Sequence, residues 1–171
     1  EVIIPSYTYS ATALCVYNVG AKPVMVDVDN DFNISIDKIS ENITTKTKAI
    51  IAVDIGGWPA NYKKIYEIIL SQNIKKKFNP QNSIQSKLGR ILLISDAAHS
   101  IGSSVNGINA GMLSDITIFS FHSVKNITTG EGGAICLNLP KAFDNKEEKV
   151  YLKSLSLHGQ NKSAFEKNQV G

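Results

Sequence analysis

Lys125 lies in a polar loop that is bounded by glycines and follows an apolar run typical of a β-strand. The run contains Ile116, Ile118, Phe119 and Phe121, and the hydroxyl-rich and glycine-rich residues after it do not continue a packed strand. Ligands of open α/β sheets gather at the carboxyl ends of strands. A lysine is also the side chain that forms an imine with a carbonyl cofactor. The segment therefore predicts a reactive amine, although most loop lysines are solvated surface charges.

A carboxylate follows a second strand-like run in the same way. Residues 90–102 read RILLISDAAHSIG, in which an apolar strand leads to Asp96, two alanines and His99. Taken alone, Asp96 would be interpreted as the N-cap of a following helix. Because a lysine stands at the end of a later strand, the pair favours a site shared by two strand ends, where small residues let a ligand approach closely.

These residues lie in segments that resemble the DegT/DnrJ/EryC1/StrS family of pyridoxal-phosphate-dependent sugar aminotransferases. Four segments match in order, and LSLHG near the C-terminus adds a fifth: EVIIPSYTYSATA at the start, GAKPVMVDVD at 20–29, SDAAHSIG at 95–102 and FSFHSVKNITTGEGGAI at 119–135. The match covers nearly all of the chain, and the TGEGG run makes it specific. It implies an α/β fold, a three-layer, mostly parallel sheet flanked by helices, as in the large domain of type I (aspartate aminotransferase) pyridoxal-phosphate enzymes.

The resemblance also implies roles for the two strand-end residues. Lys125 resembles the catalytic lysine that binds the cofactor, pyridoxal 5'-phosphate, as a Schiff base, and Asp96 resembles the carboxylate that pairs with the pyridine nitrogen. A carboxylate there stabilises the protonated ring, which draws electrons from the substrate Cα. The displaced lysine is then a base near the Cα proton. Family members that dehydrate sugars carry His at the lysine position, so Lys125 favours amino transfer.

Five further residues are weaker candidates, three of them by the same resemblance. Ser120 matches a residue that helps to hold the cofactor phosphate, His99 a residue near the cofactor ring, and Tyr9 an aromatic that stacks on the ring. Each could instead be purely structural: Ser120 as a turn residue at the strand end, His99 as a histidine with its hydrogen bonds formed inside the protein, and Tyr9 as a core aromatic. Trp58 and His122 are candidate substrate-binding residues by position. In structural terms, Trp58 could instead be a core or rim aromatic, and His122 could form a hydrogen bond within its loop. His158, in LSLHG, is interpreted only as ending a helix.

Composition indicates a soluble globular chain. Hydrophobic residues make up 43% and charged residues 19% of the 171 residues, and no apolar run is long enough to span a membrane. The net charge of +3 is too small to indicate nucleic-acid binding, and the run Lys75–Lys77 has no interleaved aromatics. Cys15 and Cys136 lack metal-ligand spacing and are interpreted as buried thiols of a cytoplasmic protein, so no metal site is expected. Phosphate-loop and dinucleotide-binding motifs are absent from the sequence.

Apolar runs alternate with amphipathic ones, as a parallel sheet with connecting helices requires. Residues 75–87, which are polar and contain a proline, are interpreted as a surface excursion. The sequence predicts strands at Val2–Ile4, Pro23–Val28, Thr47–Val53, Ile91–Ile94, 116–121 and Ala134–Leu137, and helices at Ser10–Asn18, Asn61–Gln72 and Lys141–Leu157.

The chain is expected to transfer an amino group, from L-glutamate, to a keto group of a nucleotide-linked sugar. Residues 1–171 are interpreted as a fragment, the cofactor-binding large domain, with an N-terminal segment and a small C-terminal domain lying outside it. The family resemblance implies a homodimer with a shared active site. Two alternatives remain: another type I pyridoxal-phosphate enzyme, such as a lyase or sugar dehydratase, and a non-catalytic module. The sugar itself cannot be read from the sequence.

Overall fold

The computed structural model describes residues 1–156, so His158 lies outside the described residues. The described residues divide into two units, one of residues 1–138 and one that begins at residue 139. All of the candidate site residues belong to the first unit, and α6 (Asn145–Ser156) is the described helix of the second. None of the helices in residues 1–156 combines the length and the apolar character needed to cross a membrane.

The first unit alternates strands and helices along the chain. Its strands are β1 (Val2–Pro5), β2 (Pro23–Val26), β3 (Ala49–Val53), β4 (Leu92–Asp96), β5 (Ser104–Val105), β6 (Ile108–Asn109), β7 (Ile116–Ser120) and β8 (Gly133–Leu137). Its helices are α1 (Ser10–Asn18), α2 (Ile36–Asn42), α3 (Tyr62–Leu70), α4 (Gln72–Lys77) and α5 (Ser83–Leu88), with short 3-10 turns η1 (Ile55–Gly57) and η2 (Ala110–Met112).

Six strands form one sheet in the order β2-β1-β3-β4-β7-β8. The first five are parallel to one another, and only β8 runs antiparallel, against β7. The hairpin β5–β6 stands apart as a two-stranded sheet. The expectation of a mostly parallel α/β sheet is thus confirmed, and the parallel arrangement brings the carboxyl ends of β3, β4 and β7 to one edge.

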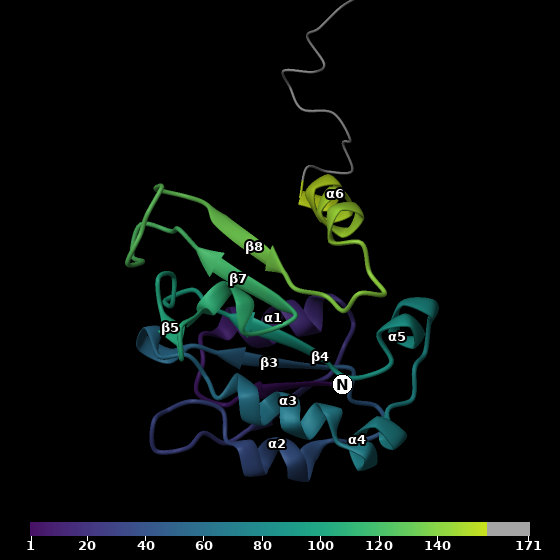
Figure 1. Ribbon diagram of the computed structural model, residues 1–171. Helices are drawn as coiled ribbons and strands as arrows, with labels where there is room; N and C mark the ends of the chain where they lie inside the picture. The colour runs from purple at the N-terminus through teal and green to yellow at the C-terminus, as the bar shows by residue number, and fades with distance from the viewer. Residues whose placement is uncertain (157–171) are drawn as a thin grey trace, which may run out of the picture. The chain divides into compact units, whose positions relative to one another are not determined.

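Helices cover both faces of this sheet, which confirms the three layers (Figure 1). Ile3 and Ile50 pack with Ile39 of α2 and Ile65 of α3 on one face. Their neighbours in the sequence, such as Ile4, point to the other face and pack with α1. Alternate strand residues therefore serve different layers, as a strand buried on both faces requires. Each fully buried isoleucine contributes roughly 1.5–3 kcal/mol.

Helix boundaries follow local capping. Helix α1 has the predicted bounds Ser10–Asn18. Helix α3 begins after Asn61, whose side chain accepts a hydrogen bond from Lys64 N at 3.2 Å, and it ends before the predicted residue 72. Its early end has a clear cause, since Ser71 caps the following helix α4 by accepting from Ile74 N.

The surface excursion predicted for residues 75–87 is exposed as expected, but it is more regular than predicted. It contains the end of α4 and most of α5, which Asn82 caps by accepting from Gln85 N at 2.9 Å. The sequence reasoning also missed α2 and the β5–β6 hairpin. Both are short, and a helix of seven residues leaves little apolar periodicity to detect.

A buried ion pair joins the starts of two adjacent strands at the amino end of the sheet. Arg90, before β4, forms a bidentate pair with Asp115, before β7, with both N–O distances at 2.7 Å. Asp115 also accepts from Leu93 N at 2.9 Å and from Tyr66 Oη at 2.9 Å. Burial and the negative charge of Asp115 raise the pKa of Tyr66, so its hydroxyl stays protonated and donates.

Candidate functional site

The candidate site lies at the carboxyl edge of the sheet. Asp96 is the last residue of β4, and Ser120 is the last residue of the adjacent strand β7. The two strands are in register there, because Asp96 pairs with Ile118 and Ala97 N donates to Ile118 O at 2.9 Å. The sequence prediction that both motifs follow strand ends is therefore confirmed.

Asp96 is half-buried, and the first turn of α1 fixes its carboxylate. Thr12 Oγ1 donates to Asp96 Oδ2 at 3.1 Å, and Ala98 N donates to Oδ1 at 3.3 Å. Thr12 is itself buried and shares a hydrogen bond of 2.8 Å with Thr8 Oγ1. Each carboxylate oxygen thus has one partner from the chain and keeps a lone pair for a further donor.

Lys125 is half-buried and lies against His99. The distance from Lys125 Nζ to His99 Nε2 is 2.9 Å. When the lysine is an ammonium, His99 accepts at Nε2 and carries its own proton on Nδ1. A second contact joins the same two loops, because Asn126 Nδ2 donates to Ile101 O at 3.2 Å. The structure therefore brings together two residues that the sequence singled out 26 positions apart.

The loop that carries Lys125 closes on itself between β7 and β8. Phe121 N donates to Gly132 O at 2.8 Å, and Thr129 N donates to Phe121 O at 3.0 Å. Gly132 adopts φ +155°, and a Cβ at this position would lie 2.5 Å from Thr129 Oγ1. The TGEGG run is thus a geometric requirement of this return, since a side chain at Gly132 would push the loop open.

Ser120 and His122 have different surroundings. Ser120 Oγ accepts a long hydrogen bond of 3.4 Å from His122 N, and no described residue accepts from its hydroxyl. That hydroxyl is free to donate to an anionic oxygen. His122 is exposed, and its Nε2 lies 3.7 Å from Glu131 Oε1 within the same loop. The structure thus gives the His122 side chain partners in its own loop, and among the described residues it forms no hydrogen bond with Lys125.

Tyr9 and Trp58 are both exposed, by 80% and 69%. Tyr9 precedes α1, three residues before Thr12, and Trp58 follows η1. Their exposure argues against the core-aromatic interpretation and leaves both rings free to contact a ligand. Gly57, beside Trp58, approaches the loop of His99 so closely that a Cβ would lie 2.9 Å from His99 O.

Several residues of this edge escaped the sequence reasoning. Thr12 and Asn126 orient the carboxylate and the lysine loop. Asp54 is buried directly after β3, and its N donates to Asp96 O at 3.0 Å. The hydroxyl-rich run SYTYSAT was the available signal for Thr12, since hydroxyls gather where polar partners lie. No local signal pairs Thr12 with Asp96, because 84 positions separate them.

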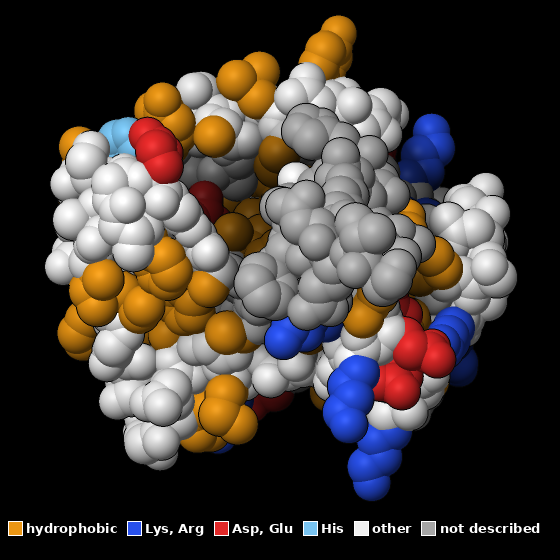
Figure 2. Space-filling model, turned by 90° about the horizontal axis from the view of Figure 1, so that it is seen from above, with side chains coloured by type: hydrophobic (Ala, Val, Ile, Leu, Met, Phe, Trp, Pro, Cys, Tyr) orange, Lys and Arg blue, Asp and Glu red, His pale blue; other side chains and the backbone are white. Residues whose placement is uncertain are grey.

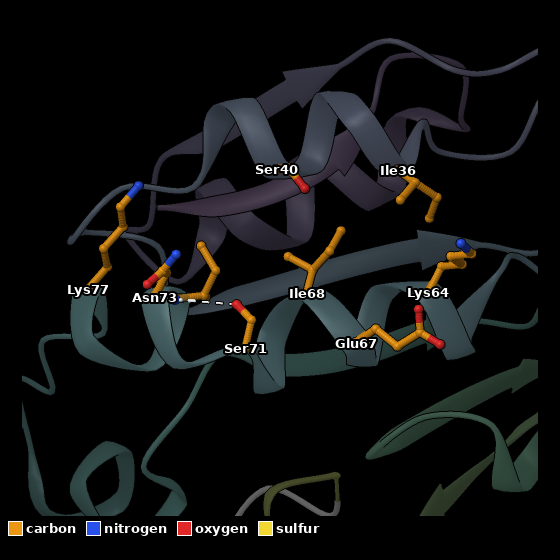
Figure 3. A pocket seen from close by; sticks show the side chains of 9 residues that line it. Ile36, Ser40, Lys64, Glu67, Ile68, Ser71, Asn73 and Lys77 are labelled. Carbon is orange, nitrogen blue, oxygen red and sulfur yellow. Dashed lines mark hydrogen bonds between the residues drawn. The ribbon is translucent and has the colours of Figure 1, made fainter.

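A shallow groove lies elsewhere in the first unit, between α2 and the pair α3–α4 (Figure 3). It is lined by Ile36, Ser40, Lys64, Glu67, Ile68, Ser71, Asn73, Ile74 and Lys77. None of the predicted site residues lines it, so the chemistry is not assigned to this groove. Among residues 1–156 no cluster of three His, Cys, Asp or Glu side chains is arranged to hold a metal ion.

Comparison with known proteins adds a family match. The sequence model of the DegT/DnrJ/EryC1/StrS aminotransferase family matches residues 1–75 and 81–171. GDP-perosamine synthase of Escherichia coli O157:H7 is 36% identical over 145 residues, which cover 84% of this chain and 35% of the synthase. A Methanocaldococcus jannaschii protein, MJ1066, is 36% identical over 168 residues. The chain spans 38% of the length of that relative.

Solved structures have the same fold. Spr1654 from Streptococcus pneumoniae in its PMP form superposes with a TM-score of 0.90 at 39% identity, over all of this chain and 43% of that one. A GDP-4-keto-6-deoxymannose-3-dehydratase, ColD, superposes with a TM-score of 0.67 at 29% identity, over 83% of this chain and 33% of that one.

Proposed function

Because the chain belongs to the DegT/DnrJ/EryC1/StrS aminotransferase family, we propose that the protein transfers an amino group, from L-glutamate, to a keto group of a nucleotide-linked sugar. The observation that carries this proposal is the arrangement at the carboxyl edge of the sheet. Lys125 Nζ lies 2.9 Å from His99, and Asp96 ends the strand beside the one that leads to the lysine. Residues 1–171 are the cofactor-binding part of that enzyme.

The residues of this edge fit pyridoxal 5'-phosphate as the cofactor. They offer an amine, a carboxylate with an unused lone pair on each oxygen, and a hydroxyl free to donate. When bound, the cofactor supplies an aldehyde for condensation with an amine and a ring that withdraws electrons. The donor set thus matches the three polar parts of the molecule: the aldehyde, the ring nitrogen and the phosphate.

Asp96 holds a proton at the pyridine nitrogen, since a carboxylate beside that atom favours its charged form. Thr12 and Ala98 keep the carboxylate in one orientation. Lys125 binds the cofactor through its amine and, when released, takes a proton from the substrate Cα and returns it. An arginine in place of Lys125 would perform neither task, because the guanidinium stays protonated.

The remaining candidate residues bind and orient the cofactor and the sugar. Ser120 donates to the phosphate, His99 lies at the ring beside Lys125, and Tyr9 stacks on the ring face. Trp58 and His122 are the side chains proposed for the sugar, and the exposure of Trp58 supports a stacking role. The synthase named above makes a GDP-linked sugar, which supports a nucleotide-linked substrate here.

We also propose that the protein works as a homodimer with a shared active site in the cytoplasm. Helix α1 exposes Leu14, Tyr17 and, at its end, Val19, and such apolar side chains favour burial against a partner. Further exposed hydrophobic side chains are visible on the face shown in Figure 2. Cys15 and Cys136 are free thiols, but Cys15 is exposed and Cys136 is half-buried, so the expectation that both are buried is wrong.

The test is a half-reaction with L-glutamate. The purified protein, loaded with pyridoxal phosphate, is expected to release one equivalent of 2-oxoglutarate per site and to convert the cofactor to pyridoxamine phosphate. Lys125→Ala is expected to lower this rate by a factor of about 10⁴ or more, because it removes both the attachment and the base. Asn138→Ala, at the other end of β8, is the control for folding. Retention of the wild-type rate by Lys125→Ala would contradict the proposed role.

A sugar dehydratase is the second candidate, because ColD superposes on this chain. Lys125 stands where dehydrating members of the family carry His, which favours transfer. GDP-4-keto-6-deoxymannose together with glutamate separates the two reactions. An amino sugar, identified by mass spectrometry, supports the aminotransferase. Loss of a hydroxyl without gain of nitrogen identifies a dehydratase, and failure to take up the cofactor identifies a non-catalytic module.

A further inference from the structure

Asp54 is a buried carboxylate at the carboxyl edge of the sheet that the proposed reaction leaves without a role. It directly follows β3 and is 1% exposed. No lysine or arginine of residues 1–156 forms an ion pair with it. A buried charge is costly unless hydrogen bonds compensate for it. Asp54 therefore needs donors, and the structure supplies them from two directions.

The two carboxylate oxygens hold two different parts of the site. Oδ1 accepts from Ala60 N at 3.1 Å and from Tyr62 Oη at 2.5 Å, at the start of α3. Oδ2 accepts from Ser100 Oγ at 2.5 Å. Ser100 follows His99 and lies in the segment 97–103 between β4 and β5. One side chain thus joins the start of α3 to the segment that carries His99.

The backbone reinforces the same connection. Asp54 N donates to Asp96 O at 3.0 Å, which ties the ends of β3 and β4 together. Ser103 Oγ donates to Gly57 O at 2.8 Å, so the far end of segment 97–103 also rests on η1. Segment 97–103 is therefore clamped at Ser100 and at Ser103, with His99 beside the first clamp.

The charges around Asp54 fit a carboxylate held by neutral donors. Burial raises the pKa of Asp54, the hydrogen bonds from Ser100, Tyr62 and Ala60 lower it, and the nearby charge of Asp96 raises it. Burial and the charge of Asp54 raise the pKa of Tyr62 well above its usual range. Tyr62 thus stays protonated as a donor, and Tyr62 and Asp96 are the titratable groups that face Asp54.

We propose that Asp54 is a positioning residue: through Ser100 it fixes segment 97–103 on the turn Ile55–Trp58, and so sets how His99 faces Lys125. The proposal rests on the proposed function of Lys125 as the cofactor-binding lysine. Loss of the Asp54–Ser100 hydrogen bond frees His99 to move from Lys125 Nζ. The protonation of the lysine-bound cofactor then changes, although neither Asp54 nor Ser100 touches the reacting atoms.

Two variants and one matched control test this assignment. Ser100→Ala removes one hydroxyl. Asp54→Asn keeps the Oδ1 acceptor but replaces the charged acceptor Oδ2 with an amide Nδ2, so the bond to Ser100 loses its charge and Ser100 Oγ has to accept instead of donate. Tyr66→Phe is the control, because Tyr66 lies one turn along α3 from Tyr62 and donates its hydrogen bond to Asp115 instead of Asp54. The control removes a tyrosine hydroxyl of the same helix without touching the Asp54 network.

The first readout is the pH dependence of the absorption of the lysine-bound cofactor. Ser100→Ala and Asp54→Asn are expected to move the titration midpoint by about half a pH unit or more, since one hydrogen bond is worth roughly that much. They are also expected to lower kcat by about tenfold with a smaller change in KM for glutamate. Tyr66→Phe is expected to change neither value. Wild-type midpoints and rates in both variants, with the cofactor bound stoichiometrically, would overturn the proposal.

The second readout does not depend on the cofactor. Amide hydrogen exchange in segment 97–103 of the cofactor-free protein is expected to be faster by about tenfold in both variants and unchanged in Tyr66→Phe. An unchanged exchange rate in Ser100→Ala would contradict the proposal that Asp54 holds segment 97–103 through Ser100, even when Asp54→Asn fails to fold. A wild-type protein that binds no cofactor would refute the proposed function instead, and the exchange experiment would still decide the role of Asp54.

Discussion

Two buried carboxylates, Asp54 and Asp115, lie at opposite ends of the same sheet and are held in different ways. Each is 1% exposed and each accepts from a tyrosine of α3, Tyr62 or Tyr66, one helical turn apart. Asp115 also has the bidentate guanidinium of Arg90. The donors that hydrogen-bond Asp54 are all neutral.

The difference separates a structural end of the sheet from a functional one. At the amino end a neutralised pair joins β4 to β7, and its only evident consequence is to hold the strands in place. At the carboxyl edge the carboxylate of Asp54 has no cationic partner, and it is linked to Asp96 through the backbone and to the residue after His99 through Ser100. Burial raises the pKa of Asp54, which means that its charge costs stability at neutral pH. Such a cost is typical of sites where function constrains the residues.

The largest loss of stability is expected when the ion pair between Arg90 and Asp115 is broken. Asp115→Ala leaves Arg90 buried without its carboxylate and is expected to lower the free energy of unfolding by about 3–5 kcal/mol. Urea unfolding of the cofactor-free protein measures it. The double variant Arg90→Met, Asp115→Leu is the control. It is expected to recover part of the loss because no charge is stranded, although Leu93 N and Tyr66 Oη still lack their acceptor. A loss below about 1 kcal/mol in Asp115→Ala would show that this pair is not the structural anchor of the amino end.

A smaller loss is expected at the carboxyl edge. Asp54→Ala leaves Ala60 N without its acceptor and leaves Tyr62 and Ser100 only their second acceptors, Ser95 Oγ at 2.6 Å and Ala97 O at 3.5 Å. The expected cost is about 1–3 kcal/mol, and no cation is stranded. The same unfolding experiment compares it with Asp115→Ala. A loss equal to that of Asp115→Ala would remove the distinction between the two ends.

The smallest effect is a pH dependence that separates wild type from Asp54→Asn. The folded-state pKa of Asp54 is raised above its unfolded value of about 3.9, so the protonated form binds its proton more tightly in the folded protein. The stabilisation is complete below about pH 3.9 and is lost as the pH rises through the folded-state pKa. Wild type is therefore expected to lose stability relative to Asp54→Asn as the pH rises above about 3.9 and through the folded-state pKa of Asp54. A difference that stays constant or grows in favour of wild type would contradict the raised pKa.

The sequence predicted the parts of this account that depend on local pattern. The strand ends at Asp96 and Ser120 and the bounds of α1 follow from apolar runs and the polar residues that stop them. The sequence did not predict the short helix α2, because seven residues give too little apolar periodicity to detect. The contacts of Thr12 with Asp96 and of Asp54 with Ser100 escaped for another reason. They join residues 84 and 46 positions apart, and only the sheet order brings these together.

The most direct test of the central claim is to trap the cofactor on the protein. The purified protein is mixed with pyridoxal phosphate, reduced with borohydride, digested and examined by mass spectrometry. One pyridoxyl label per chain is expected, located on Lys125, with no label at that position in Lys125→Arg. A label on another lysine, or no label at all, would contradict the assignment of Lys125 and with it the proposed aminotransferase.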